Sequence, residues 1–96
     1  MTPEGKVKAK VNEALKPFGP NLWKFMPVQT GYGIPGLDYL LCVKGHFVAI
    51  ETKVKGKHLT ARQYETKQRI ESAGGKVFVV DDLPSLDIAI GYLVSL

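Results

Sequence analysis

Residues 37–53, with the sequence LDYLLCVKGHFVAIETK, contain the pattern that decides the fold of this chain. Two apolar segments, 37–43 and 46–53, are separated by Lys44-Gly45. Apolar segments joined by a short turn that contains glycine are typical of a β-hairpin. We therefore predict two adjacent antiparallel strands, with the reservation that a bulge at the turn would shift their pairing by one residue.

The pairing of the two strands follows from the length of the turn. If the turn holds only two residues, Val43 pairs with His46, and counting outwards places Asp38 opposite Glu51. Directly opposed residues share a face of the sheet, with Cβ atoms roughly 4.5–5.5 Å apart. Lys53 lies two positions beyond Glu51 and shares that face. The hairpin therefore predicts two carboxylates and one amine in one place.

The flanking sequence predicts helices around this hairpin. Thr2 before Pro3 is typical of a helix start, and Thr60 with Gln63 three residues later fits a capping box. The predicted elements are a helix from Pro3 that ends by Gly19-Pro20, strands at 22–28, 37–43 and 46–53, a Gly- and Pro-rich connection at 31–36, a helix at 61–73, a strand at 76–80 and a short closing helix around 86–93. This order, α-β-β-β-α-β-α, predicts an α/β fold with a mixed β-sheet flanked by helices.

Length and composition limit what the chain can be. Its 96 residues, 45% hydrophobic and 23% charged, predict one globular domain over residues 1–96. Cys42 is the one cysteine, which excludes an internal disulfide or a cysteine-based zinc cluster and favours a reducing compartment. The sequence has no apolar signal core and no run near the ~20 apolar residues of a membrane span. We expect a cytoplasmic protein with no membrane partner.

The charge of +4, from 13 basic and 9 acidic residues, suits a polyanionic partner such as nucleic acid. Lys55, Lys57 and Arg62 lie next to the predicted carboxylates and are the candidates for binding phosphates. A basic surface that serves solubility accounts for the charge equally well. Trp23 and Tyr32 are able to stack on bases, although packing against other parts of the fold is the commoner role of such residues.

Carboxylates that interrupt apolar strands need a compensating charge. At about 5 Å and an effective dielectric near 20, two of them repel by roughly 3 kcal/mol. A bound Mg²⁺ or Mn²⁺ offsets this repulsion, because oxygen ligands select hard cations. Asp38 and Glu51 are the predicted ligands, with the backbone carbonyl of Thr52 as a further one, and Lys53 is suited to orient water or neutralise the phosphorane. The alternative is a surface ion-pair ladder worth about 0–1 kcal/mol per pair.

Four motifs occur in an order and spacing that resemble a known family. They are Gly33-Ile-Pro-Gly-Leu-Asp38, Ala49-Ile-Glu-Thr-Lys53, Leu59-Thr-Ala-Arg-Gln63 and Ala73-Gly-Gly-Lys-Val-Phe-Val-Val80. The chain resembles, from about residue 2 to residue 81, the VRR-NUC (virus-type replication-repair nuclease) group of the PD-(D/E)xK superfamily. One departure is that the usual Gly-x-Pro-Asp is replaced here by Pro35-Gly-Leu-Asp38.

The resemblance implies a restriction-endonuclease-like core and DNA hydrolysis that depends on Mg²⁺ or Mn²⁺. Stand-alone members of the group are small, often phage-encoded, and are associated with cutting branched DNA, including four-way (Holliday) junctions, as homodimers. By the same resemblance, Asp38 and Glu51 are metal ligands and Lys53 is the catalytic lysine. Gln63 matches a glutamine that the family places on a helix near the site. Its capping role is the alternative, and one side chain is able to serve both.

Two further carboxylates are candidates for the site. Related nucleases often place a glutamate on the first helix near the metal, which makes Glu4 a candidate, while a carboxylate favoured by the helix dipole is at least as good an explanation. Glu13 is a weaker candidate, because it lies opposite the apolar stripe of that helix.

The expected function is therefore a structure-selective DNA endonuclease that acts as a symmetric dimer. One small unit offers one active site, whereas paired incisions need two, most simply related by a two-fold axis. The rivals are a nickase or flap nuclease that acts as a monomer, and a non-catalytic nucleic-acid-binding module with the same fold.

Overall fold

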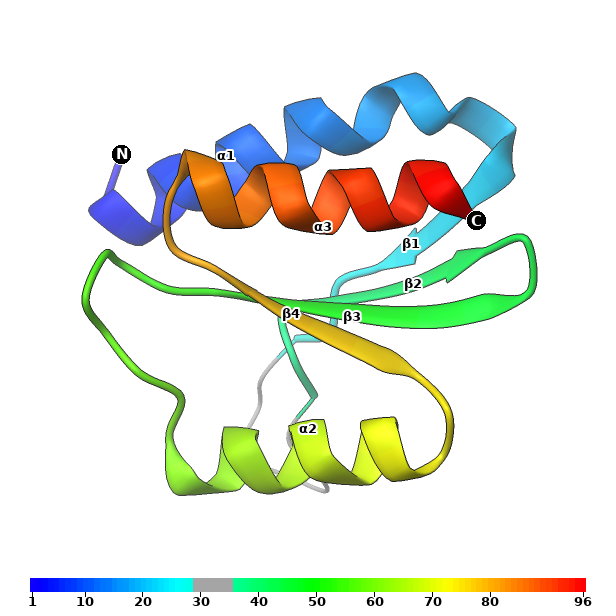
Figure 1. The fold of residues 1–96 in the computed structure, drawn as a ribbon. Coiled ribbons are helices and arrows are strands. Elements are labelled where there is room, and N and C mark those ends of the chain that lie inside the picture. The colour runs from blue at the N-terminus through cyan, green and yellow to red at the C-terminus, as the bar shows by residue number, and fades with distance from the viewer. Residues whose placement is uncertain (29–35) are drawn as a thin grey trace.

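A four-stranded mixed sheet forms the centre of the protein (Figure 1). The computed structural model describes residues 1–28 and 36–96. The strands lie in the order β1-β2-β3-β4, in which β1–β2 and β2–β3 are antiparallel and β3–β4 is parallel. They span Leu22–Phe25 (β1), Tyr39–Val43 (β2), His46–Thr52 (β3) and Lys76–Val80 (β4).

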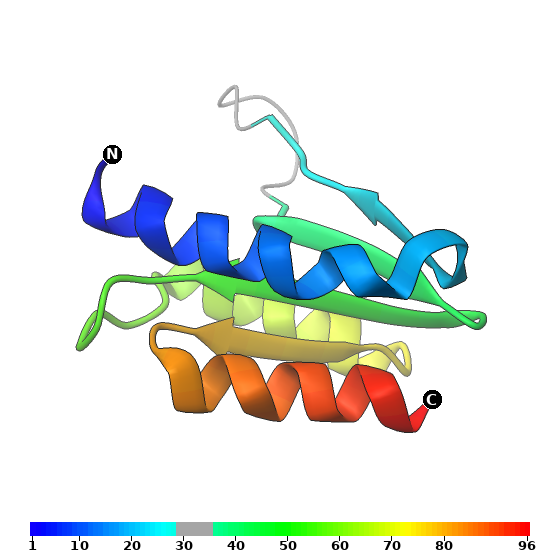
Figure 2. The same cartoon turned by 90° about the horizontal axis from the view of Figure 1, so that it is seen from above.

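Helices cover both faces of this sheet. Helices α1 (Pro3–Leu15) and α3 (Leu83–Ser95) lie side by side on one face, and α2 (Ala61–Ser72) lies on the other (Figures 1 and 2). A 3-10 helix, η1 (Lys16–Asn21), connects α1 to β1. The predicted order of helices and strands is therefore confirmed for the described residues, and no helix among them is long and apolar enough to cross a membrane.

The β2–β3 hairpin has the predicted register, without a bulge. Val43 pairs with His46, and Tyr39 pairs with Ile50. Both turn residues have positive φ, 50° at Lys44 and 82° at Gly45. Such a turn matches the twist of the flanking strands, so the register follows from a two-residue loop.

Several helices and strands are shorter than predicted. Strand β1 ends at Phe25 rather than at residue 28, and Pro27 has no N–H with which to extend the ladder. Strand β2 begins at Tyr39 rather than at residue 37, because the chain bends at Asp38, and β3 ends at Thr52. The first helix gives way to η1 after Leu15, and the predicted connection at 31–36 lies outside the described residues except for its last one.

Short polar motifs define the helix ends. Thr60 and Gln63 form the predicted capping box of α2, and Gly74, at φ 98°, follows the end of that helix. The closing helix starts earlier than predicted, because Asp82 caps it and forms a second box with Ser85. The Asp-x-x-Ser pattern at 82–85 was a readable signal for that start.

The core is unequal on the two sides of the sheet. The larger cluster joins α1 and α3 to the sheet through Val11, Leu15, Tyr39, Leu41, Val43, Val48, Ile50, Val80, Leu86, Ala89 and Leu93. The smaller cluster, towards α2, holds Leu37, Ala49 and Val77 with Ile70 packed against it. No residue of α2 is fully buried, so the sheet face beneath α2 leaves room for polar side chains.

A buried tyrosine ties α1 to the start of β2. The single proton of the Tyr39 hydroxyl is shared between two acceptors, the carbonyl of Lys8 at 3.2 Å and Oδ1 of Asn12 at 3.1 Å. Burial, and then the charge of Asp38, raise the pKa of Tyr39 from its ordinary 10.0 to about 12. This contact holds the first half of α1 beside Asp38.

Candidate metal centre

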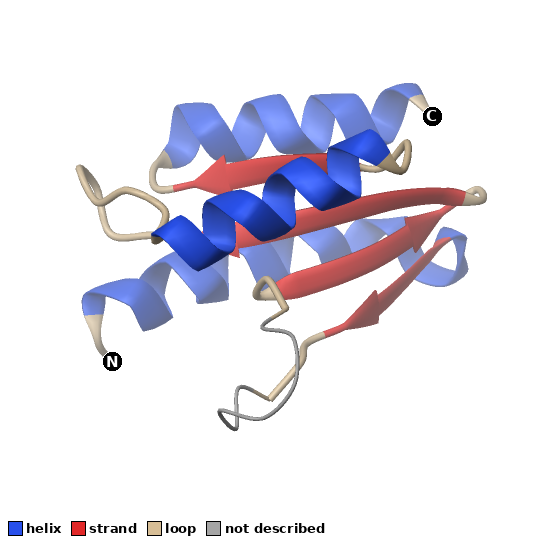
Figure 3. Cartoon of the chain, turned by 90° about the horizontal axis from the view of Figure 1, so that it is seen from below, coloured by secondary structure: helices blue, strands red, loops and turns tan. Residues whose placement is uncertain are grey.

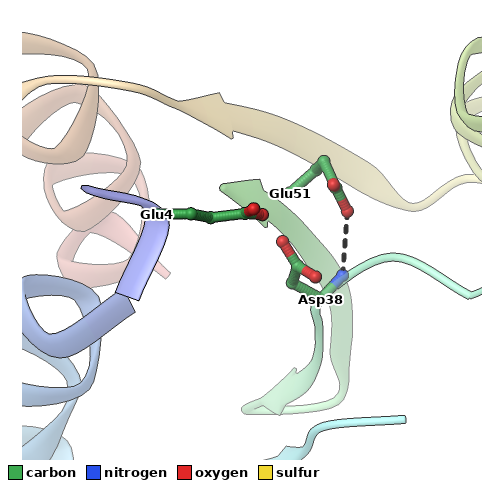
Figure 4. Close-up of side chains that lie close together, drawn as sticks. All are labelled: Glu4, Asp38 and Glu51. Carbon is green, nitrogen blue, oxygen red and sulfur yellow. Dashed lines mark hydrogen bonds between the residues drawn. The ribbon is translucent and has the colours of Figure 1, made fainter. Parts of the chain in front are cut away.

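Three carboxylates from three separate elements converge at one end of the sheet (Figure 4). Glu4 comes from the first turn of α1, Asp38 from the bend before β2, and Glu51 from β3. One oxygen of each lies within 4.8 Å of the others. The structure therefore brings Glu4 to the predicted pair. Glu13 is not part of this group; its carboxylate pairs with Lys16 at 2.8 Å on the surface.

Hydrogen bonds to the end of β3 fix the orientation of Asp38. Its Oδ2 accepts from the backbone N–H of Thr52 at 2.9 Å and from the Thr52 hydroxyl at 2.7 Å. In return, the backbone N–H of Asp38 donates to Oε1 of Glu51 at 3.0 Å. The prediction that these acids oppose each other as side chains across a regular ladder was therefore wrong in detail, because the chain bends at Asp38 and its amide meets the Glu51 carboxylate.

Glu51 is held from the other side by α2 and by the strand end. Glu51 is buried, with only 3% of its surface exposed. Oε2 accepts from the amide Nε2 of Gln63 at 3.0 Å and lies 3.8 Å from the ammonium of Lys53. The Gln63 side-chain oxygen also accepts from the Thr60 backbone N–H at 3.0 Å. Gln63 thus caps α2 and contacts the site carboxylate at the same time.

Burial gives Glu51 an unusual acidity. Loss of solvent, and then the neighbouring charge of Asp38, raise the pKa of Glu51 from its ordinary 4.5 to about 7. The hydrogen bond from the Asp38 N–H and the charge of Lys53 act in the opposite direction but do not cancel this effect. A carboxyl group with such a pKa favours a nearby cation, because a cation stabilises its ionised form.

The residues predicted to bind phosphates differ in their surroundings. Lys55 forms an ion pair with Asp82, the cap of α3, and this contact raises the pKa of Lys55 and lowers that of Asp82. Lys57 and Arg62 are exposed. Lys55 must therefore break its ion pair with Asp82 before it can bind a phosphate, whereas the side chains of Lys57 and Arg62 are accessible from solvent.

Two aromatic residues, Trp23 and Tyr32, were candidates for stacking on bases, and the structure describes one of them. Trp23 is 63% exposed and stacks on Phe25, with ring centroids 6.1 Å apart, so it is not a core residue. Tyr32 lies outside the described residues.

The sequence reasoning missed two contributions to the site. Lys8 places its ammonium 3.6 Å from Oδ1 of Asp38; it lies four residues after Glu4, and that spacing on a helix was the available signal. Thr52 was predicted to act through its carbonyl, yet its amide and hydroxyl make the contacts with Asp38. A ligand role for the Thr52 carbonyl stays a prediction.

The pKa of Glu51 predicts a pH-dependent stability of the metal-free protein. Because the folded state raises this pKa from 4.5 to about 7, the contribution of protonated Glu51 is fully present below about pH 4.5 and is lost as the pH rises through about 7, a change of roughly 3 kcal/mol. Urea unfolding in EDTA, measured between pH 4.5 and 8.5, should show this decline.

The matched control is Glu51→Gln, which cannot ionise but keeps the size of the side chain. Its free energy of unfolding should fall less over the same pH range, and the difference between the two proteins isolates Glu51 from all other titrating groups. Parallel pH profiles of the two proteins would contradict the assignment.

Comparison with known proteins places this geometry on a known fold. A solved structure described as a VRR_NUC domain superposes with a TM-score of 0.79 and 22% sequence identity, covering 96% of this chain and 98% of that one. No family model and no curated protein sequence matches the chain. The chain therefore has the fold of a VRR_NUC domain, as its sequence motifs predicted.

Proposed function

We propose that this protein is a metal-dependent, structure-selective DNA endonuclease that hydrolyses phosphodiester bonds with Mg²⁺ or Mn²⁺. The observation that carries this proposal is the meeting of Glu4, Asp38 and Glu51 with oxygens within 4.8 Å of one another, on the fold of a VRR_NUC domain. Lys53 beside Glu51 supplies the fourth member of the proposed site.

The donor set fits a hard divalent cation. The candidate ligands are all carboxylate oxygens, the type of donor that Mg²⁺ and Mn²⁺ prefer. When ionised, these carboxylates carry three negative charges against the two positive charges of Lys8 and Lys53. A divalent ion in this position would lower the pKa of a bound water and polarise a phosphate oxygen.

The protein residues prepare the site for that chemistry. Thr52 fixes one oxygen of Asp38, and Gln63 fixes one oxygen of Glu51, so both carboxylates are oriented before any ligand arrives. The Lys53 ammonium is placed to stabilise negative charge that develops on the phosphoryl group. Glu4, on a helix turn exposed to solvent, completes the carboxylate group from the opposite side of the sheet.

The proposed substrate is branched DNA, such as a four-way junction. Lys55, Lys57 and Arg62 suit contacts with phosphates, which position a nucleic acid but do not read its bases. Selection by the shape of the DNA rather than by its sequence is consistent with such contacts.

We propose that the protein acts as a homodimer through the β1 edge of its sheet, on the face that also carries α2. Trp23 pairs with Cys42 and Cys42 with Phe47, which places these residues in one row on the face that also carries α2. Strand β1 is at the sheet edge, and in Figure 3 it lies to the side of α2. A second copy would cover this edge together with Trp23, Phe47 and Phe25, which follows Trp23 by two residues on the same strand face.

The size and composition of this surface favour a protein partner. Trp23, Phe25 and Phe47 are 63%, 49% and 45% exposed, and rings of this kind present on the order of 300 Å² together. A standard interface buries about 800 Å² per partner and is rich in aromatic residues at its centre. The three rings would thus form the central part of such an interface.

Replacing Asp38 with Asn tests the catalytic proposal. Asparagine still offers an oxygen to Thr52, so the fold should persist, while the loss of the charge should lower junction cleavage at least about 10²-fold, the scale of one lost electrostatic contact to a transition state. Cleavage is measured on junction, flap, linear and single-stranded DNA with Mg²⁺, Mn²⁺ or EDTA, and binding is measured in parallel.

Retained DNA binding with lost cleavage supports the endonuclease. A wild-type protein that binds DNA but never cuts it with either metal would instead be a binding module. A monomer that cuts flaps or single strands and ignores junctions would be a nickase or flap nuclease.

Gln63→Ala should weaken Mn²⁺ binding by about 10- to 100-fold, the usual effect of losing a residue that orients a metal ligand. The control is Thr60→Ala, which removes the other half of the same capping box but leaves the Gln63 amide available to Glu51. Calorimetric titration with Mn²⁺ compares the two. Equal losses would assign the effect to the helix cap instead of the Glu51 contact.

Trp23→Ser should weaken self-association at least about 30-fold, because a central aromatic residue contributes 2 kcal/mol or more to a typical interface. Sedimentation equilibrium measures the dissociation constant. Ile88→Ser, on the exposed side of α3, is the matched control and should behave as wild type. A wild-type protein that stays monomeric at high concentration would refute the dimer.

A further inference from the structure

Lys8 is a basic residue of α1 that lies beside the carboxylates. Its backbone carbonyl accepts from the buried Tyr39 hydroxyl at 3.2 Å, and Tyr39 directly follows Asp38 in the chain. This contact sets the helix turn that carries Lys8 against the start of β2. The ammonium then lies 3.6 Å from Oδ1 of Asp38, and the side chain is 37% exposed.

The two oxygens of Asp38 have different partners. Oδ2 accepts both hydrogen bonds from Thr52, while Oδ1 faces the Lys8 ammonium. A cation that binds the Asp38 carboxylate therefore competes with Lys8 for its charge. The lysine stem is flexible and partly exposed, so the ammonium is able to move aside without disturbing the helix.

Lys8 differs in this respect from the other lysines near the site. The Lys53 ammonium faces the other carboxylate of the hairpin, Glu51, at 3.8 Å. Lys55 is paired with Asp82. Lys6 is exposed on the same helix as Lys8, but two residues along a helix turn a side chain to nearly the opposite side. Lys8 alone of these four contacts Asp38 in the described structure.

We propose that Lys8 is a phosphate-binding residue of the active site. In the metal-free protein its ammonium is the counter-ion of Asp38. Once a divalent cation occupies the carboxylates, the ammonium binds a non-bridging phosphate oxygen of the DNA strand held there. The proposal rests on the metal-dependent nuclease function proposed above and assigns to α1, through Lys8, a direct contact with the substrate.

The electrostatic reason is an exchange of partners. A divalent cation supplies the charge that Asp38 receives from Lys8 in its absence, and it repels the nearby ammonium. A phosphate oxygen is the anion that such a site brings closest to Lys8, and lysine binds phosphate as a compact point charge. Lys8 should therefore oppose metal binding when DNA is absent and favour DNA binding when metal is present.

Lys8→Met tests this exchange, with Lys6→Met as the matched control. Mn²⁺ titrated by calorimetry without DNA should bind two- to fivefold tighter to Lys8→Met than to wild type, the range expected from removing a partly exposed ion pair. Lys6→Met should match wild type. Lys8→Arg, which keeps the charge, should also stay close to wild type.

DNA binding supplies the second measurement. With Ca²⁺ as the divalent ion, the plot of log K against log salt for a four-way junction should be shallower for Lys8→Met by about 0.7–0.9, the value of one phosphate contact. In EDTA the slopes of Lys8→Met and wild type should coincide, because Lys8 then stays with Asp38. Lys8→Arg should retain the wild-type slope under both conditions.

The outcomes separate this inference from the proposed function. A wild-type protein that binds neither Mn²⁺ nor DNA refutes the nuclease proposal itself. A wild-type protein that binds both, with Lys8→Met indistinguishable from Lys6→Met, overturns the role of Lys8 alone. Arginine behaving like methionine at position 8 also overturns it, because the charge would then not be the cause.

Discussion

The reciprocal contact between Asp38 and the end of β3 is the constraint on which the rest of the site depends. The Asp38 carboxylate accepts from the amide and hydroxyl of Thr52, and the Asp38 amide donates to Glu51. These bonds hold two carboxyl groups close together and leave one oxygen of Asp38 directed towards Lys8. Without them, the Asp38 and Glu51 side chains would lose the contacts that orient them towards each other and towards Glu4.

The unequal core explains why the site lies where it does. Helices α1 and α3 bury one face of the sheet under a large apolar cluster, whereas α2 contributes no fully buried residue. The sheet face towards α2 can therefore hold Glu51 with a polar partner, Gln63, instead of an apolar one. Burial without full neutralisation raises the pKa of Glu51 to about 7. A surface ion-pair ladder does not describe a carboxylate that is only 3% exposed.

The lysines around the site have distinct partners, and this division shapes the proposed chemistry. Lys53 lies against Glu51, Lys8 against Asp38, and Lys55 against the cap of α3. Net charge alone treats them as one basic surface. Their placement separates three roles: Lys53 is suited to stabilise the reacting phosphate, Lys8 is suited to leave Asp38 and bind the substrate, and Lys55 is paired with the acid that caps α3.

The sequence by itself determined the local geometry: the hairpin register set by a two-residue turn, the capping box of α2, and the proximity of Glu51 and Lys53, which are two residues apart on one strand end. These features depend on backbone periodicity and short-range hydrogen bonds. Only the tertiary structure decided that Asp38 leaves the ladder, that Glu4 joins the site while Glu13 does not, and that Lys8 and Lys55 have acidic partners. The contacts of Glu4, Lys8 and Lys55 join residues far apart in the chain, and they follow from how α1 and α3 pack on the sheet, which a local pattern does not encode.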